Sequence, residues 1–188
     1  MVPTRNISRL TSGFTLTEML VTLLIMVLAS TLLATGVPVA IDTYQKTVNS
    51  ANAQVAMSTT ITVLRSEYGL SPKVMSRGVG ADTEVYYMTE EGLWAIIRNP
   101  KGDETYKGLV KEYVKTDSYG NPDPSNSLGT YPLVPDAAFK GANRPLELRV
   151  ASIAEAVGKV SVTNLSVTDG TNELAKVDSY DVATRFAN

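Results

Sequence analysis

Glu18 is the residue of this sequence whose placement most needs a chemical explanation. It stands directly before an uncharged stretch of 23 residues, from Met19 to Ile41, that is dominated by apolar side chains. A carboxylate near the middle of a transmembrane helix costs about 2.5 to 3.5 kcal/mol on insertion scales. One interpretation places Glu18 at the headgroup level, where its charge costs little and favours the positive end of the helix. The other requires a cation that pairs with Glu18 in an apolar environment.

The residues before the apolar stretch suggest a source for such a cation. Residues 1–13 are polar, carry two arginines but no acid, and end in a small Ser-Gly pair. In an ordinary secretory signal the small residues of the cleavage site follow the apolar region, whereas here they precede it. Cleavage between Gly13 and Phe14 would leave the apolar helix at the new N-terminus, with a free amine four residues from Glu18.

The motif GFTLTEML and the apolar stretch after it resemble the class III signal of type IV pilins and type II secretion pseudopilins. Gly13 before the cut, Phe14 after it and Glu18 at the fifth mature position match that signal, while Thr17 is more polar than the usual residue. The resemblance implies cleavage after Gly13 by a prepilin peptidase and N-methylation of Phe14. It further implies that an assembly ATPase and its platform protein move the chain from the membrane into a filament of pilin subunits.

In such a filament the helices are staggered, so that Glu18 of one subunit can lie beside the Phe14 amine of its neighbour. Leaving either charge alone in an apolar bundle is costly. A charge-assisted contact between the two would therefore chiefly select the register of assembly.

One long helix is expected to position these residues, because apolar side chains recur every three or four residues in two adjacent stripes. The first stripe is Ile41, Tyr44, Val48, Ala51 and Val55, and the second is Ala53, Met57, Ile61, Leu64 and Tyr68. Gly69 and Pro72 then end the pattern. We predict a helix over residues 14–68, of which 14–41 lie in the membrane or filament core and 42–68 form an amphipathic continuation. The uncharged stretch would cover about 35 Å, enough to cross a bilayer.

Gly36 and Pro38 interrupt this helix, because proline removes a backbone hydrogen bond and glycine loosens the turn before it. They predict either a local kink at the membrane exit or a segment that melts when the subunit enters a filament. Two arginines lie before the span and one Asp and one Lys lie soon after it. This asymmetry favours a cytoplasmic N-terminus, with the bulk of the chain outside.

Residues 69–188 are expected to form an extracytoplasmic β-rich domain. The pattern predicts strands over 83–89 and 92–99 joined as a hairpin, a strand or short helix over 105–115, and strands over 146–152, 159–169 and 175–186. Residues 116–144 are rich in Pro, Gly, Asn, Asp and Ser and are predicted to be loops with a variable surface. The fold class is α+β, a long N-terminal helix packed on a C-terminal antiparallel sheet, which is the pilin fold that the resemblance implies.

Asp117, Asn121, Asp123 and Asn126 offer oxygen ligands of the kind that calcium uses, and some pseudopilins bind calcium in a comparable loop. Their spacing differs from that of an EF-hand, and Asp and Asn are ordinary turn formers, so turn chemistry is the favoured interpretation. No metal or other cofactor is predicted. The chain has no Cys and no His, which excludes disulfides, thiolate metal sites and a Ser-His-Asp triad. We therefore expect no enzymatic activity.

Three classes of function remain. Removal of residues 1–13 takes two of the 17 cations and none of the 19 acids, which leaves a net charge of −4, and no nucleic-acid motif stands out. The favoured function is a structural subunit of a type IV pilus, and the segments VYYMTEEGLWAIIRN and VSVTNLSVTDG resemble the minor pilins and minor pseudopilins. The alternatives are a pseudopilin of a type II secretion or DNA-uptake system and, more remotely, a membrane-anchored enzyme or binding protein. The expected location is first the membrane, as a single-pass protein, and then a filament at the cell surface.

Overall fold

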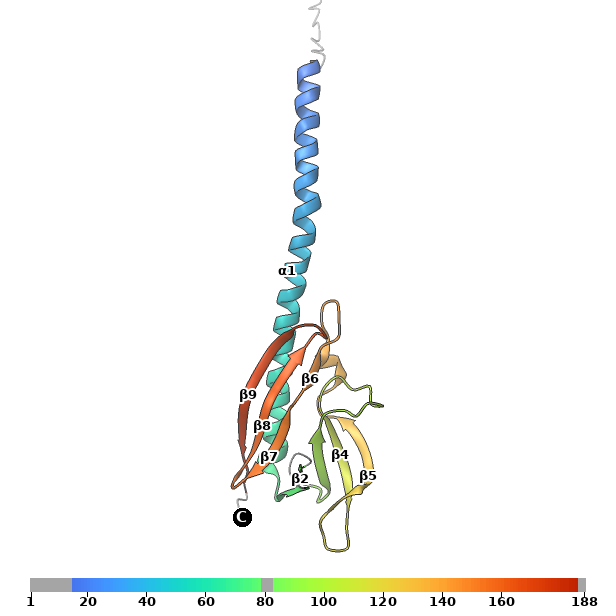
Figure 1. The fold of residues 1–188 in the computed structure, drawn as a ribbon, viewed down its shortest axis with the longest axis vertical. Helices are drawn as coiled ribbons and strands as arrows, with labels where there is room; N and C mark the ends of the chain where they lie inside the picture. The colour runs from blue at the N-terminus through green and yellow to red at the C-terminus, as the bar shows by residue number, and fades with distance from the viewer. Residues whose placement is uncertain (1–14, 79–82, 186–188) are drawn as a thin grey trace, which may run out of the picture. The chain divides into compact units, whose positions relative to one another are not determined.

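The computed structural model describes residues 15–78 and 83–185. Helix α1 (Leu16–Leu70) opens the described chain, and strands follow it, with one short 3-10 helix, η2 (Asp136–Phe139), between them. The predicted α+β layout is confirmed, because a long apolar N-terminal helix packs on antiparallel β-structure (Figure 1). The chain divides into two compact units, residues 1–44 and 45–188.

In the first unit, α1 is apolar on every side. Its large side chains are exposed, for example Leu16 at 83% and Leu32 at 72%. A helix that is hydrophobic all round belongs in a membrane or inside a larger assembly. Helix α1 is long and apolar enough to cross a bilayer, so the described chain has one candidate membrane-spanning helix near its N-terminus, consistent with a single-pass membrane protein.

Hydroxyl groups in this unit bond back to their own helix. Thr22, Ser30, Thr31 and Thr35 donate to carbonyl oxygens three or four residues earlier, at 2.7 to 3.3 Å. Such bonds satisfy the hydroxyls without a neighbouring helix. Helix α1 also continues without a break across residues 36–38, and the kink or melting segment expected there stays a prediction.

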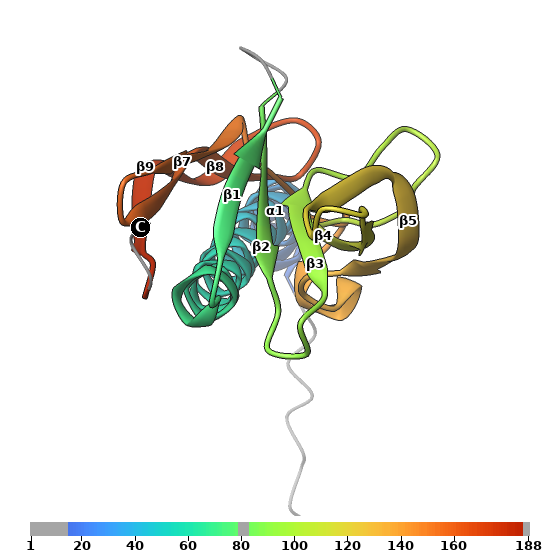
Figure 2. The same cartoon turned by 90° about the horizontal axis from the view of Figure 1, so that it is seen from below.

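The first sheet of the second unit contains five antiparallel strands in sequence order (Figure 2). They are β1 (Val74–Arg77), β2 (Glu84–Met88), β3 (Trp94–Arg98), β4 (Val110–Thr116) and β5 (Pro122–Pro132). The predicted hairpin over residues 83–99 is confirmed as β2 and β3, which pair from Tyr86 opposite Ile96 to Met88 opposite Trp94. The segment 105–115 contains β4, so the strand alternative is the correct one there.

The second sheet is built around β8 (Lys159–Thr168). Strand β9 (Glu173–Ala183) pairs along one side of β8, while β6 (Glu147–Arg149) and β7 (Ser152–Ala156) pair with the two ends of its other side. The single strand predicted over residues 146–152 is therefore confirmed for β6 but wrong in its length, because β7 begins at Ser152 as a separate strand. The chain forms β6, leaves the sheet and then begins β7.

Strand β8 changes its buried face part of the way along. Val160 and Val162 are buried before Asn164, and Leu165 and Val167 are buried after it. Asn164 has a left-handed backbone with φ of 48°, a conformation that Asn tolerates better than most residues. The irregularity lets both ends of a long, twisted strand keep their apolar side chains in the core.

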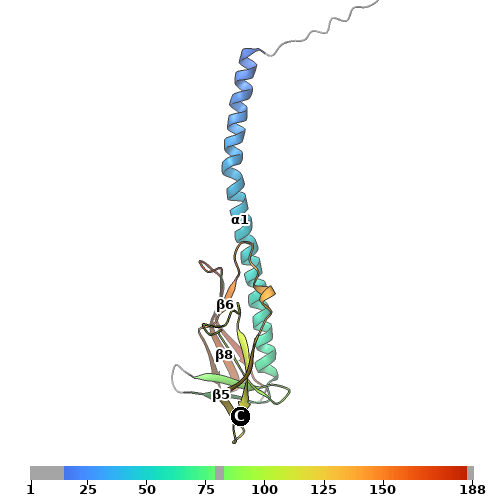
Figure 3. The same ribbon diagram turned by 90° about the vertical axis from the view of Figure 1, so that its right-hand side faces the viewer.

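Residues 45–70 of α1 and both sheets bury a common core (Figure 3). The cluster joins side chains of α1, of the first sheet and of the second, among them Leu64, Tyr68, Tyr87, Ile97, Val160 and Leu165. The second predicted stripe of α1 is the one that packs on the sheets. Ala51 and Val55 of the first stripe stay exposed, Val55 at 61%, so one apolar side of the helix remains uncovered within the described chain.

The prediction of loops over residues 116–144 is wrong in part, because β5 lies within that segment. Strand β5 is at the edge of its sheet, and an edge strand tolerates proline and exposed polar residues because one side of its backbone needs no partner. Its pairing with β4 shifts register on both sides of Val114. Strand β1, also at an edge, carries too little alternation to have been predicted.

Candidate functional site

Glu18 lies in the first turn of α1 and bonds to Thr15, which stands directly before the helix. Glu18 Oε2 accepts from the Thr15 amide at 3.1 Å and from Thr15 Oγ1 at 3.0 Å, and the Glu18 amide donates to Thr15 Oγ1 at 3.3 Å. This reciprocal arrangement is a capping box, which satisfies amide groups that the first turn of a helix leaves unpaired. Within a single chain, Glu18 therefore stabilises the start of its own helix.

The capped carboxylate retains an acceptor for a second partner. Both hydrogen bonds that the Glu18 carboxylate receives from other described residues go to Oε2, and a carboxylate has acceptor sites on both oxygens. Gly13 and Phe14, the predicted cleavage and methylation sites, lie outside the described residues. Gly36 and Pro38 lie inside α1, and a Cβ at Gly36 would meet nothing within 4 Å, so packing within this chain does not demand glycine there.

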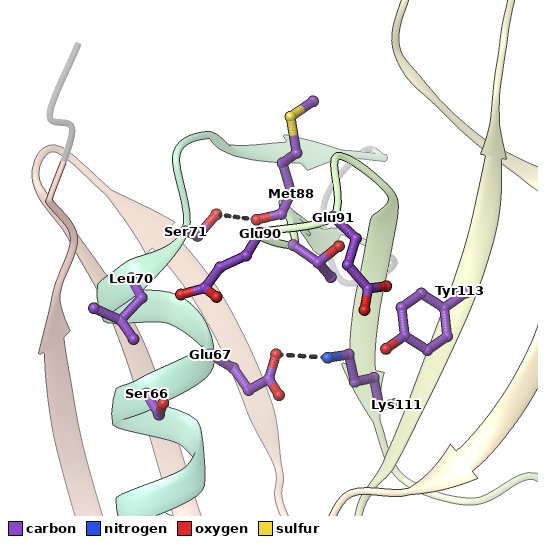
Figure 4. A pocket seen from close by; sticks show the side chains of 10 residues that line it. Ser66, Glu67, Leu70, Ser71, Met88, Glu90, Glu91, Lys111 and Tyr113 are labelled. Carbon is purple, nitrogen blue, oxygen red and sulfur yellow. Dashed lines mark hydrogen bonds and ion pairs between the residues drawn. The ribbon is translucent and has the colours of Figure 1, made fainter.

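A groove in the second unit brings together charged and aromatic residues from α1, β2 and β4 (Figure 4). Glu67 Oε2 accepts from the Tyr87 hydroxyl at 2.8 Å and from Lys111 Nζ at 2.7 Å. Lys111 Nζ also lies 5.6 Å from the ring centre of Tyr87 and 5.0 Å from that of Tyr113. These are cation–π distances. The cluster ties the last turns of α1 to the first sheet.

The electrostatics of this cluster favour a fixed ion pair. Burial by itself would lower the pKa of Lys111, but the hydrogen bond and the charge of Glu67 outweigh it, so the pKa is raised. Burial and then the charge of Glu67 raise the pKa of the Tyr87 hydroxyl. Lys111 therefore stays protonated and Tyr87 stays neutral near pH 7, and neither is tuned for acid-base catalysis at that pH.

The turn between β2 and β3 forms the rim of the groove. The Thr89 amide donates to Leu93 O at 2.8 Å, the Gly92 amide donates to Thr89 O at 2.9 Å, and Gly92 has φ of 80°. This tight turn places Glu90 and Glu91 at the edge of a pocket of about 270 Å³, with Glu67 on its opposite wall (Figure 4). Both rim glutamates are exposed, and neither forms an ion pair with another described residue.

The groove continues from the rim over β4 and β5. This second part has a volume of about 530 Å³, and three of the apolar residues that line it, Leu93, Leu128 and Tyr131, are exposed. The Tyr131 ring meets Tyr113 edge-on, with ring centres 5.9 Å apart. An acidic pocket thus opens into an apolar trough. We name the whole feature the β2–β5 groove, and it suits a partner with one cationic and one apolar part.

The predicted calcium candidates lie around the turn between β4 and β5 and are bonded to the chain itself. Asp117 Oδ1 accepts from the amides of Tyr119 and Asn121 at 2.8 and 2.9 Å, and Asp123 Oδ2 accepts from Asn126 Nδ2 at 2.6 Å. The Asn121 amide is the main cause that lowers the pKa of Asp117, and Asn126 is the main cause for Asp123. Among residues 15–78 and 83–185, no group of three or more acidic side chains is arranged to hold a metal ion.

Two features of these sites go beyond the sequence predictions. Thr15 and Glu18 match the pattern of a capping box, Ser or Thr followed three residues later by Glu, so the sequence did carry that signal. The β2–β5 groove has no comparable local signal, because Glu67, Glu91 and Lys111 are brought together only by the packing of α1 on the first sheet.

The structure defines a class of protein, one in which a candidate membrane-spanning N-terminal helix continues into an antiparallel α+β domain. Comparisons of the chain with protein-family models, with curated proteins and with solved structures found no match. The function is therefore inferred from the residues themselves.

Proposed function

We propose that this chain is a structural subunit of a type IV pilus, and specifically a minor pilin. The observation that carries the proposal is the continuity of α1, which runs without a break from an exposed apolar segment of membrane length into the core of an antiparallel β domain. An apolar helical segment with no cover from its own chain needs lipid or other subunits around it. The motif GFTLTEML at its start supports the filament over a plain anchor.

Assembly in this proposal depends on α1. A prepilin peptidase removes residues 1–13 and methylates Phe14, and the mature chain stays in the membrane until an assembly ATPase and its platform protein move it into the filament. Helices then pack side by side, and each Å² of apolar surface that they bury contributes about 25 cal/mol. Contacts of this head-to-tail kind give an open filament because the rotation between subunits does not close.

Glu18 sets the register of this packing. Its Oε2 belongs to the capping box of its own helix, and Oε1 accepts from the Phe14 amine of a neighbouring subunit. A neighbour in the wrong register would leave one charge unpaired in apolar surroundings, which is strongly unfavourable. The contact thus selects one alignment from the many that a smooth apolar helix would allow.

Intact mass and N-terminal sequencing of the membrane form test the proposal. The chain is expressed with and without a prepilin peptidase that is known to process another prepilin in the same cells. We expect a peptidase-dependent loss of residues 1–13, Phe14 at the new N-terminus and one added methyl group, while Gly13→Leu stays uncut. An uncut wild-type chain beside the active peptidase would reject the proposal and leave α1 as an anchor.

The amount of the chain in sheared surface fibres tests whether it is a minor or a major pilin. We expect a trace component that co-purifies with a more abundant pilin. A chain that dominates the fibres would be the major pilin. Loss of protein secretion or DNA uptake on deletion, with long fibres intact, would assign it to the pseudopilins.

A further inference from the structure

We propose that the β2–β5 groove receives the tip of the β7–β8 hairpin and the adjoining Arg185 from a second copy of this chain. The inference rests on the proposed function, because it names a contact between the globular units of neighbouring subunits. It concerns only the second unit of each copy, residues 45–188.

Within the described chain, the groove carries two unpaired acidic side chains at its rim and exposed apolar side chains in its trough. Lys111 is neutralised by Glu67 at 2.7 Å, which leaves Glu90 and Glu91 at the rim without an ion pair among the described residues. Leu128 and Tyr131 are 46% and 57% exposed in the apolar trough. The partner must therefore offer a cation and, close to it, an apolar side chain.

The hairpin tip offers that combination. Val157, between β7 and β8, is 89% exposed, which is the largest exposure of any large apolar side chain that the structure describes. Gly158 O accepts from the Thr184 amide at 3.0 Å, so the chain directly after β9 is fastened to the tip. Arg185 directly follows Thr184, so its backbone lies near the tip that carries Val157. Arg185 is exposed and has no ion pair within the described ranges. We name Val157 and Arg185 together the hairpin knob.

The base of the knob is stiffened by bonds between β8 and β9. Asp181 accepts from Lys159 Nζ and from Ser161 Oγ, each at 2.6 Å. These bonds pair Lys159 and leave Arg185 as the cation of the knob. A pre-formed knob loses less conformational entropy on docking than a loose loop would.

Knob and groove lie on opposite flanks of the C-terminal end of α1. The two views agree that β9 lies on one side of this part of the helix and β4 and β5 on the other, while β7 and β8 cross over the helix in Figure 1 (Figures 1 and 2). They also lie at the same level, because Glu67 lines the groove and Gly69, two residues later, lies against the backbone of Ala183 near the knob. Parallel copies placed side by side therefore bring the knob of one to the groove of the next.

Such a contact joins two different surfaces, so it repeats in one direction and does not close a dimer. That is the kind of contact that a filament needs. A second copy also explains why the complementary surfaces occur on one chain, which an unrelated cationic partner would leave unexplained. Because the ion pair is near the surface, it will be screened by salt.

Cysteine cross-linking tests the contact directly, since the chain contains no cysteine. Full-length chains that carry Val157→Cys and Leu93→Cys are oxidised in cells that assemble the filament. We expect a ladder of dimers and larger multimers from the double variant and none from either single variant. Val157→Cys paired with Tyr119→Cys is the matched control, because Tyr119 is 87% exposed but does not line the groove. A dimer from Val157→Cys alone would indicate a symmetric contact and overturn the proposal.

Charge reversal provides the second measurement. Glu91→Lys and Arg185→Glu should each reduce cross-linking by roughly two- to fivefold, the range expected for one exposed ion pair. The two reversals combined should restore it. If the chain that carries both reversals does not regain cross-linking, another cationic partner occupies the groove. The same conclusion follows if Glu91→Lys reduces incorporation into fibres but leaves cross-linking unchanged.

The two proposals can fail separately. If the chain is processed and enters fibres but the 93–157 pair yields no ladder, only the docking contact is rejected. If the chain is never processed and no pair cross-links, the filament function fails and the contact with it. A ladder in membranes without fibres would support the contact alone.

Discussion

Glu18 combines a helix cap with a charge, and two substitutions separate these properties. Gln also completes a capping box, so Glu18→Gln keeps the bonds to Thr15 and removes the charge. We expect Glu18→Gln subunits to accumulate in the membrane at the wild-type level and to fall by tenfold or more in sheared fibres. The physical reason is that an unpaired partner of a buried ion pair costs about 3 to 5 kcal/mol. Quantitative immunoblots of the membrane and the sheared fractions measure both.

Thr15→Ala is the matched control, because it removes the cap and keeps the carboxylate. The helix start should lose about 0.5 to 2 kcal/mol, while incorporation into fibres stays close to the wild-type level. If Thr15→Ala subunits were missing from fibres and Glu18→Gln subunits were present, the cap and not the charge would govern assembly.

Gly108 is a residue for which close packing, and not backbone freedom, requires glycine. A Cβ there would lie 2.5 Å from Cζ and 2.6 Å from Cε2 of the buried Phe139 ring. Gly108→Ala should therefore destabilise the folded chain by about 1 to 3 kcal/mol, the usual cost of overpacking. Urea unfolding of the full chain in detergent measures the change. Gly102→Ala is the control, because a Cβ at Gly102 meets nothing within 4 Å, and equal stability losses would refute the packing argument.

At the scale of elements, Arg98 joins β3, β4 and the turn between them. Its guanidinium donates to both carboxylate oxygens of Glu104 at 2.8 Å and to Glu112 Oε2 at 2.7 Å. Arg98 lowers the pKa of Glu104 to about 2, mainly through this hydrogen bonding. Burial alone would raise the pKa of Glu112, but the hydrogen bonds from Arg98 and Ser127, together with the charge of Arg98, outweigh burial and the pKa is lowered.

These shifts predict a loss of stability in acid. A carboxyl whose folded pKa lies below its unfolded value stabilises the fold above the unfolded pKa, and the stabilisation disappears as the pH falls toward the folded pKa. For Glu104 that window runs from about pH 4.5 down to about pH 2. We expect a loss of about 1 to 2 kcal/mol after solvent screening. Glu104→Gln should flatten this part of the curve of unfolding free energy against pH, and an unchanged slope would show that Glu104 contributes nothing.

Elements differed in how far the sequence determined them. Helix α1 was predictable to within two residues of its C-terminal end, because a 3.6-residue period sustained over many turns and the Gly69 stop leave few alternatives. The β2–β3 hairpin was also predictable, because its two β-rich segments and the short turn between them are adjacent in the sequence. Strand β5 was not, because its pairing with β4 outweighs a composition that favours turns. The β2–β5 groove depends on contacts between residues 67, 91 and 111, which no local pattern encodes.

At the scale of the whole molecule, several apolar or charged surfaces stay exposed in a single copy of the chain. The first unit exposes its apolar side chains, the second unit exposes the helical stripe at Ala51 and Val55, and the groove and knob are chemically complementary. Each of these surfaces is compatible with a stable folded domain, because the core lies elsewhere, between α1 and the two sheets. Stability and assembly should therefore respond to different substitutions.

Val55→Arg tests that separation. Val55 is 61% exposed and lies outside the core, and arginine is a good helix former, so the free energy of unfolding should change by no more than about 0.5 kcal/mol. If this stripe packs against neighbouring helices in the proposed filament, an arginine there would be left unpaired in apolar surroundings, which is strongly unfavourable, so incorporation into sheared fibres should fall by about tenfold. Tyr119→Arg is the control, since Tyr119 is exposed but lies outside both α1 and the groove. Equal incorporation of both variants would show that the uncovered stripe of α1 faces solvent in the assembled state, and the filament contacts would then have to come from the apolar first unit and the knob alone.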